Sequence, residues 1–134
     1  MDMQFLDENA LKALIRRLST SNDPYAREDL DTVEKAMEAF HNYINTVVDG
    51  EMKLMMQSSS LEGQEYRDAI AQYDGNRHSA HERAISDVKL LNRLAAREGL
   101  LPIFTGDDTQ RHQVADFCLE LDQYFFQNRR MKLS

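Results

Sequence analysis

The chain has 134 residues, of which 42% are hydrophobic and 29% are charged, and its formal net charge is −7. This balance excludes a disordered chain, and no apolar run approaches the ~18 residues that span a bilayer, which excludes a transmembrane protein. A single cysteine, Cys118, excludes a disulfide within the chain and a multi-cysteine zinc site. The N-terminal residues show no secretory signal. We expect one helical domain over residues 1–134, located in the cytoplasm and with no membrane partner.

The first half of the chain has helical periodicity in two segments, 7–20 and 24–57. Asp7 is a candidate N-cap for the first segment, and Asp23 with Pro24 opens the second. Apolar residues in the second segment step by three and four, as in a heptad, at Leu30, Val33, Met37, Phe40, Ile44 and Val47. The lone Gly50 costs a helix only ~1 kcal/mol, so we expect the second helix to continue through it.

The second half predicts helices over residues 62–98 and 107–128. Gly75 allows a kink in the first of these or a break into two helices, and we favour one helix with a kink. Gly99 is suited to the C′ position that ends this helix, and Pro102 prevents its continuation. Thr105 or Asp107 is the candidate N-cap of the last helix.

These lengths predict an all-α, antiparallel bundle of four helices, or five if the chain breaks at Gly75, around a long central hairpin. Short loops make sequential helices antiparallel. The two short helices then pack beside residues 24–42 and 80–98, and the distal hairpin, 43–75, is only two helices thick. Its face carries more apolar surface than two helices cover, at Ile44, Val47, Met52, Met55, Tyr66, Ile70 and Tyr73. A monomer seldom leaves such a patch in water, so we expect a homodimer, with binding of another protein also open.

Four side chains are candidate metal ligands: His78, His81, Glu82 and His112. The first three lie within one helical turn, and imidazole with carboxylate suits a transition metal. A polar rim, with His81 partly packed, explains the same residues without metal, and we predict no cofactor. Glu38-Ala39-Phe40-His41 contains one copy of the Glu-x-x-His pair of di-iron bundles, which use two copies.

Lys89, Arg93 and Arg97 form a basic stripe at helical spacing that phosphates or an acidic partner would fit. Cations near the end of a helix also suit its dipole, and an acidic chain makes nucleic acid an unlikely partner. Asn92 flanks the core positions, where it has a structural role, and Cys118 lies on an apolar face as a packed small side chain.

Several short runs in the second half of the chain carry a resemblance to a known family. They are His81-Glu82, Leu90 to Leu94, Pro102 to Asp107, Arg111-His112, Tyr124-Phe125 and Asn128-Arg129. Over residues 81–129 the chain thus resembles a small family of uncharacterised bacterial helical proteins. The resemblance implies a bacterial, cytoplasmic origin and a helical fold, and it implies no activity and no functional residue.

The sequence as a whole favours a non-enzymatic interaction or regulatory protein that acts as a homodimeric helical bundle. Motifs of the common hydrolase, nucleotide-binding and zinc-protease families do not occur in it. Two alternatives stay open. One is a metal- or ligand-binding bundle that uses His78, His81 and Glu82. The other is a nucleic-acid regulator that uses the basic stripe.

Overall fold

The computed structural model describes residues 3–57 and 60–133, with side chains as far as Phe125. Within these residues the chain is all-α, as predicted, and extended pairing is limited to one isolated bridge between Leu6 and Phe104. The elements follow in the order α1 (Glu8–Thr20), α2 (Ala26–Ile44), η1 (Asn45–Asp49), α3 (Gly50–Gln57), α4 (Gln64–Arg97) and α5 (Arg111–Leu133).

The first helix, α1, begins where the sequence predicts. The Asp7 carboxylate accepts the N–H of Ala10 at 3.0 Å, which satisfies one of the unpaired amides of the first turn. The buried face of the helix carries Leu11, Leu14 and Leu18, and it packs against α2 and α4.

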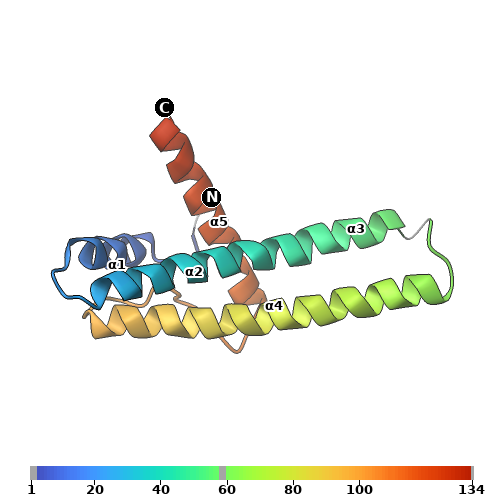
Figure 1. Cartoon of the computed structure of the whole chain (residues 1–134), viewed down its shortest axis with the longest axis horizontal. Coiled ribbons are helices and arrows are strands. Elements are labelled where there is room, and N and C mark those ends of the chain that lie inside the picture. The colour runs from blue at the N-terminus through green and yellow to red at the C-terminus, as the bar shows by residue number, and fades with distance from the viewer. Residues whose placement is uncertain (1–2, 58–59, 134) are drawn as a thin grey trace.

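The helix predicted over residues 24–57 is one continuous rod made of α2, η1 and α3 (Figure 1). It begins at Ala26 and not at residue 24, and Asp23 does not cap it, because the Asp23 carboxylate accepts the N–H of Tyr25 at 2.9 Å in the preceding turn. Asn45 and Gly50, which flank the junctions, both keep helical backbone angles, with φ of −60° and −63°. The sequence did not predict that η1 is a π-helix, which is a wider turn that places one more residue per bonded ring than an α-helix does.

The third helix, α4, is continuous through Gly75, so the alternative of a break at this glycine is wrong. It ends as predicted at Gly99, which has a φ of +71° that suits a residue without a Cβ. The N–H of Gly99 bonds the carbonyl of Ala96 at 3.0 Å, and the N–H of Leu100 bonds that of Ala95 at 2.9 Å. These two bonds form a Schellman ending.

The last helix, α5, begins at Arg111 and not at residue 107, and it extends to Leu133, beyond the predicted end at 128. Asp107 does not cap this helix, because its carboxylate accepts the N–H and the hydroxyl of Thr109, at 2.9 and 2.7 Å, in a turn that precedes it. These hydrogen bonds lower the pKa of Asp107. The carbonyl of Gln110 accepts the first helical N–H groups, those of Gln113 and Val114.

The connector between α4 and α5 is held by the N-terminal segment and by one side chain of α4. Asp7 donates its N–H to Ile103, and Thr105 donates its N–H to Phe5, both at 2.9 Å. The Asn92 Oδ1 accepts the N–H groups of Ile103 and Phe104, at 2.9 and 3.0 Å, and its Nδ2 donates to the Phe104 carbonyl. The predicted structural role of Asn92 is confirmed: its side chain holds the connector between α4 and α5 in place.

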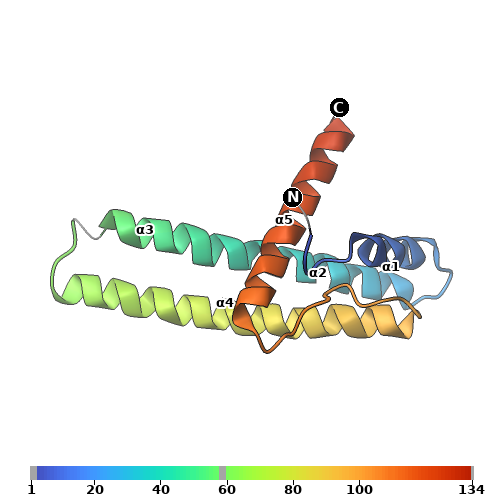
Figure 2. The same ribbon diagram turned by 180° about the vertical axis from the view of Figure 1, so that it is seen from behind.

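The hydrophobic core lies at one end of the α2–α4 hairpin, where α1 packs alongside and α5 packs across both helices. In Figures 1 and 2, α5 crosses the hairpin steeply near its middle and then extends past α2. Phe117 of α5 lies at this crossing, with its ring packed edge-on to those of Phe40 and Phe104. The crossing divides the hairpin into a covered proximal part and a distal part that no other described element reaches.

Candidate functional site

The distal part of the hairpin contains no buried residue in the ranges that the structure describes, 44–57 and 60–80. The last buried side chains before it are Tyr43 on α2 and His81 on α4. We call this part, made of η1, α3 and the first half of α4, the distal arm. Its thickness of two helices agrees with the expectation from the helix lengths.

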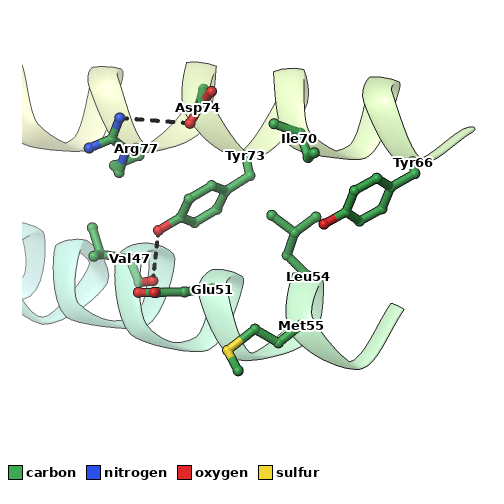
Figure 3. A pocket seen from close by; sticks show the side chains of 9 residues that line it. All are labelled: Val47, Glu51, Leu54, Met55, Tyr66, Ile70, Tyr73, Asp74 and Arg77. Carbon is green, nitrogen blue, oxygen red and sulfur yellow. Dashed lines mark hydrogen bonds and ion pairs between the residues drawn. The ribbon is translucent and has the colours of Figure 1, made fainter. Parts of the chain in front are cut away.

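A groove of about 550 Å³ runs between the two helices of the distal arm. Figure 3 shows the side chains that line it, which come from η1 and α3 on one side and from α4 on the other, with Tyr73 and Leu54 extending into the space between the helices. They are Val47, Glu51, Leu54, Met55, Tyr66, Ile70, Tyr73, Asp74 and Arg77. The groove is thus apolar along most of its length and carries charged groups at Glu51, Asp74 and Arg77.

Most of the residues predicted for an interface meet in this groove. Val47, Met55, Tyr66, Ile70 and Tyr73 all line it. Ile44 instead packs against the proximal core, and Met52 lies outside the groove with 59% of its surface exposed. The sequence analysis missed Glu51 and Leu54, although they continue the steps of four and three residues that lead to Val47.

Tyr73 ties the two helices of the arm together at the π-helix. Its hydroxyl donates to the carbonyl of Val47 at 3.1 Å, and its ring lies where a Cβ on Gly50 would come within 2.9 Å (Figure 3). The missing side chain of Gly50 therefore makes room for the ring. Burial, and then the charge of Glu51, raises the pKa of the Tyr73 hydroxyl, so it stays a donor at neutral pH.

Four exposed apolar side chains form a stripe on η1 and α3, and one of them, Met55, also lines the groove. Val48, Met52, Met55 and Met56 are 40%, 59%, 70% and 76% exposed. The other large apolar side chains with such exposure, Tyr25, Leu101 and Leu119, lie outside the arm. Spacings of four, three and one residues bring the four members of this stripe to one side of a helix.

The candidate metal ligands do not come together. His81 is buried and packs against Tyr43, with its Nδ1 3.4 Å from the tyrosine hydroxyl, whereas His78, Glu82 and His112 are exposed. No three side chains of His, Cys, Asp or Glu form a metal-binding group among the described residues. Burial, and then repulsion from Arg111, lowers the pKa of His81, so it is neutral at pH 7.

His41 of the Glu-x-x-His pair contacts Asp122 of α5 and forms no metal-binding group among the described residues. Its Nδ1 lies 2.9 Å from the Asp122 carboxylate of α5, and both side chains are about half exposed, at 58% and 43%. Glu38 lies one turn earlier on the exposed side of α2. The pair therefore connects α2 to α5 at the surface.

The basic stripe on α4 is partly engaged within the chain. Arg97 forms a salt bridge with Asp29 of α2. Lys89 and Arg93 are exposed on the surface of the proximal half. The stripe thus contributes one contact between helices and leaves two cations in solvent.

Glu120 is a buried carboxylate that the sequence did not reveal. It is 2% exposed on α5, and its Oε1 accepts the N–H of Phe5 at 3.0 Å, while its Oε2 has no hydrogen-bond partner among the described residues. The helical spacing places Glu120 beside Phe117 and Leu121. From the sequence alone, a charged residue at such a position is predicted to lie at the solvent-exposed edge of the apolar face. Its hydrogen-bond donor, the N–H of Phe5, belongs to the N-terminal segment and is 115 residues away in the sequence.

Comparison with known proteins yields one match. A family model described as "Protein of unknown function (DUF3232)" matches residues 21–131. This confirms the resemblance to a helical family without assigned activity and extends it well beyond residues 81–129. Neither the curated proteins nor the solved structures contain a match. None of the helices, over the residues described, has the length and apolar character needed to cross a membrane.

Proposed function

The chain belongs to the DUF3232 family of proteins of unknown function, and from its architecture we propose that it is a non-enzymatic interaction protein that forms a homodimer through the distal arm. The observation that carries the proposal is the lack of any buried residue among the described residues between Ile44 and Ala80. Apolar side chains are placed along the arm at core spacing, yet in the part of the chain that the structure describes none of them is buried. A second helical surface would remove them from water.

The total accessible surface of the chain is larger than that of a compact monomer, which supports an interface with a partner. The chain exposes 9057 Å², whereas a compact monomer of 15.6 kDa exposes about 7,200 Å². The excess of roughly 1,800 Å² per chain is larger than the ~800 Å² that each partner contributes to a standard interface. The excess belongs to the chain as a whole, and an interface between two arms would cover part of it.

A second copy of the chain is the occupant that the arm fits best. The groove with Tyr66 and Ile70 and the stripe with Val48 and Met52 lie on the same hairpin. Two arms related by a two-fold axis can each place an apolar stripe against the groove of the other, as an isologous interface requires. The flexible methionine side chains adapt to such a surface.

The environment of the single thiol is not that of a catalytic nucleophile. Cys118 is 1% exposed, and burial raises its pKa to about 12. A nucleophilic cysteine is accessible and ionised near neutral pH. Cys118 has neither property and packs as a small apolar side chain.

The test is the molar mass of the full chain in solution, measured by light scattering over a range of concentrations. We expect a dimer, and we expect the double variant Val48→Glu/Met52→Glu to be a folded monomer, because each copy would have to bury two carboxylates against the apolar groove of the other. The matched control is Tyr25→Glu/Leu101→Glu, which adds the same charge at side chains that are 68% and 71% exposed outside the arm. The control should remain a dimer.

A monomeric mass for the wild-type chain at high concentration would overturn the proposal. So would a dimer that persists unchanged in the Val48→Glu/Met52→Glu variant, because the interface would then lie elsewhere. Circular dichroism of each variant shows that a change of mass does not come from unfolding.

A further inference from the structure

A second groove lies in the proximal half, and the proposed homodimer leaves it unused. It has a volume of about 700 Å³ and lies where α2 meets α5, with one side chain of α1 at its edge. Its floor is apolar, because Val33, Phe40 and Leu121 form it and each is only 1% exposed. We call it the proximal groove.

The walls of the proximal groove are apolar side chains that the core covers only in part. Ile15 of α1, Met37 of α2 and Phe125 of α5 are half-buried and line it. Along α2 the lining runs from Leu30 to Asn42, which at 1.5 Å per residue is ~18 Å. An open trough of this length matches about three turns of a helix.

The mouth of the groove is acidic. Glu34, Glu38 and Asp122 line it together with His41, whose Nδ1 lies 2.9 Å from the Asp122 carboxylate. Glu34 and Glu38 are one turn apart on α2, a spacing at which like charges repel and destabilise the helix. Neither glutamate has an ion-pair partner among the described side chains.

We propose that the proximal groove binds an amphipathic helix of another protein, with lysine or arginine residues beside its apolar face. Helices that dock in grooves insert apolar anchors at spacings of three and four residues, and the floor and walls around Phe40, Met37 and Phe125 offer surface for them. The cations of the helix meet Glu34 and Glu38 and relieve their repulsion. Complementary charge of this kind selects the partner and speeds its association.

The probe is a synthetic peptide of about 14 residues, or four helical turns, with leucine at positions that form one face and lysine elsewhere. Two peptides of equal length serve as controls. One has glutamate in place of every lysine, and the other has the same composition in a shuffled order that forms no apolar face. Binding is measured by fluorescence anisotropy at low and at physiological ionic strength, and the site is located from NMR shifts of the full-length protein.

Two variants of equal charge show whether the groove is the site. Glu34→Gln/Glu38→Gln removes two carboxylates from the mouth of the groove, and Glu62→Gln/Glu65→Gln removes two exposed carboxylates from the tip of the distal arm. We expect the leucine–lysine peptide to bind wild type with a Kd that rises with salt, and to shift resonances of Met37, Leu121 and Phe125. The groove variant should weaken binding about tenfold, and the tip variant should leave it within about twofold.

The proposal is overturned if the leucine–lysine peptide does not bind at low ionic strength, or if the glutamate or shuffled peptide binds equally well. It is also overturned if the shifts fall on the distal arm, or if both double variants weaken binding to the same extent. A loss of self-association in Glu34→Gln/Glu38→Gln would identify the groove as a contact between copies of the chain and contradict the proposed occupant. The variants that test the homodimer, at Val48 and Met52, lie outside the groove, so the two proposals fail independently.

Discussion

The two ends of the α2–α4 hairpin consist of the same pair of antiparallel helices, yet only one end is a folded core. At the proximal end, α1 and α5 close over the hairpin, and side chains such as Val33, Val88 and Leu91 are 1% exposed or less. At the distal end the helices face each other across a groove, and every described side chain from Ile44 to Ala80 keeps some contact with solvent. The difference shows that two helices can hold each other in place without excluding water, and that a third layer is what produces a dry interior.

A substitution at the crossing of α5 should have the largest effect. Phe117 is fully buried, and its ring centroid lies 5.6 Å from that of Phe40 and 5.1 Å from that of Phe104. We expect Phe117→Ala to lower the free energy of unfolding by about 3–5 kcal/mol, measured by urea denaturation. Ile70→Ala in the distal arm serves as the comparison and should cost about 1 kcal/mol or less in a dilute sample. Equal losses at the two sites would show that the arm is packed as tightly as the core.

Removal of the side chain that holds the connector should have the next largest effect. Asn92→Ala leaves two amides and one carbonyl of Ile103 and Phe104 without their partner, so we expect a loss of about 2 kcal/mol in the free energy of unfolding. Asn92→Asp keeps the acceptor and loses only the donor, and it should cost about half as much. If the two variants are equally unstable, the acceptor bonds to the connector do not carry the effect.

Alanine substitutions at the two helical glycines of the arm, Gly50 and Gly75, should change the free energy of unfolding by smaller amounts that differ between the two sites. A Cβ at Gly75 meets nothing within 4 Å, so Gly75→Ala should raise the free energy of unfolding by about 0.5–1 kcal/mol. The same change at Gly50 puts a Cβ 2.9 Å from the Tyr73 ring, so the gain in helix propensity is offset by displacement of that ring. Denaturation of both variants in parallel measures the contrast. A gain at Gly50 as large as at Gly75 would show that Tyr73 moves without cost.

A change of pH is the mildest way to probe the boundary between the two ends, where His81 is buried. Its pKa is lowered from 6.5 first by burial and then by the charge of Arg111; Glu82 opposes this, and Arg77 and His78 lower the pKa further by smaller amounts. The unfolded chain therefore takes up a proton at this residue as the pH falls through 6.5, and the folded chain does not. The contribution of His81 to stability is complete above that pH and is lost progressively below it.

Denaturation at a series of pH values above and below 6.5 checks this sign. The variant His81→Gln keeps a hydrogen-bonding group beside Tyr43 but does not titrate, so its stability should fall less steeply as the pH decreases. His112→Gln removes an exposed histidine and should follow the wild-type curve. A steeper fall in His81→Gln than in wild type would contradict the assignment.

The fold was largely predictable, because the decisive signals are local. Apolar spacing located the helices, Asp7 and Gly99 fixed two of their ends, and the unequal lengths of the helices indicated an arm that extends beyond the core. The start of α5 was predicted four residues too early, since Asp107 has the chemistry of a cap but uses it in the preceding turn. A carboxylate that suits either role does not reveal from the sequence which one it takes.

The details of the candidate site were less accessible, because they depend on contacts between distant segments. The sequence placed Met52 and Met55 on one apolar face with Val47, whereas the groove includes Met55, leaves Met52 outside and continues the heptad through Glu51 and Leu54. The sequence predicted His81 to be only partly packed, and nothing in the local sequence marks Glu120 as buried. Each depends on a partner far away in the sequence, at Tyr43 and Phe5 respectively.

The π-helix also bears on how the chain tolerates changes of length. The hydrogen bonds of a π-helix join residues five apart, so a π-turn contains one residue more than an α-helical turn, and η1 therefore holds one extra residue within the rod. A single deletion between Asn45 and Asp49 would let the rod close into a regular α-helix with both flanking faces still aimed as before. A deletion in the middle of α4 would remove a residue from a regular α-helix, and it would rotate the side chains of one half of that helix by about 100° about the helix axis relative to the other half.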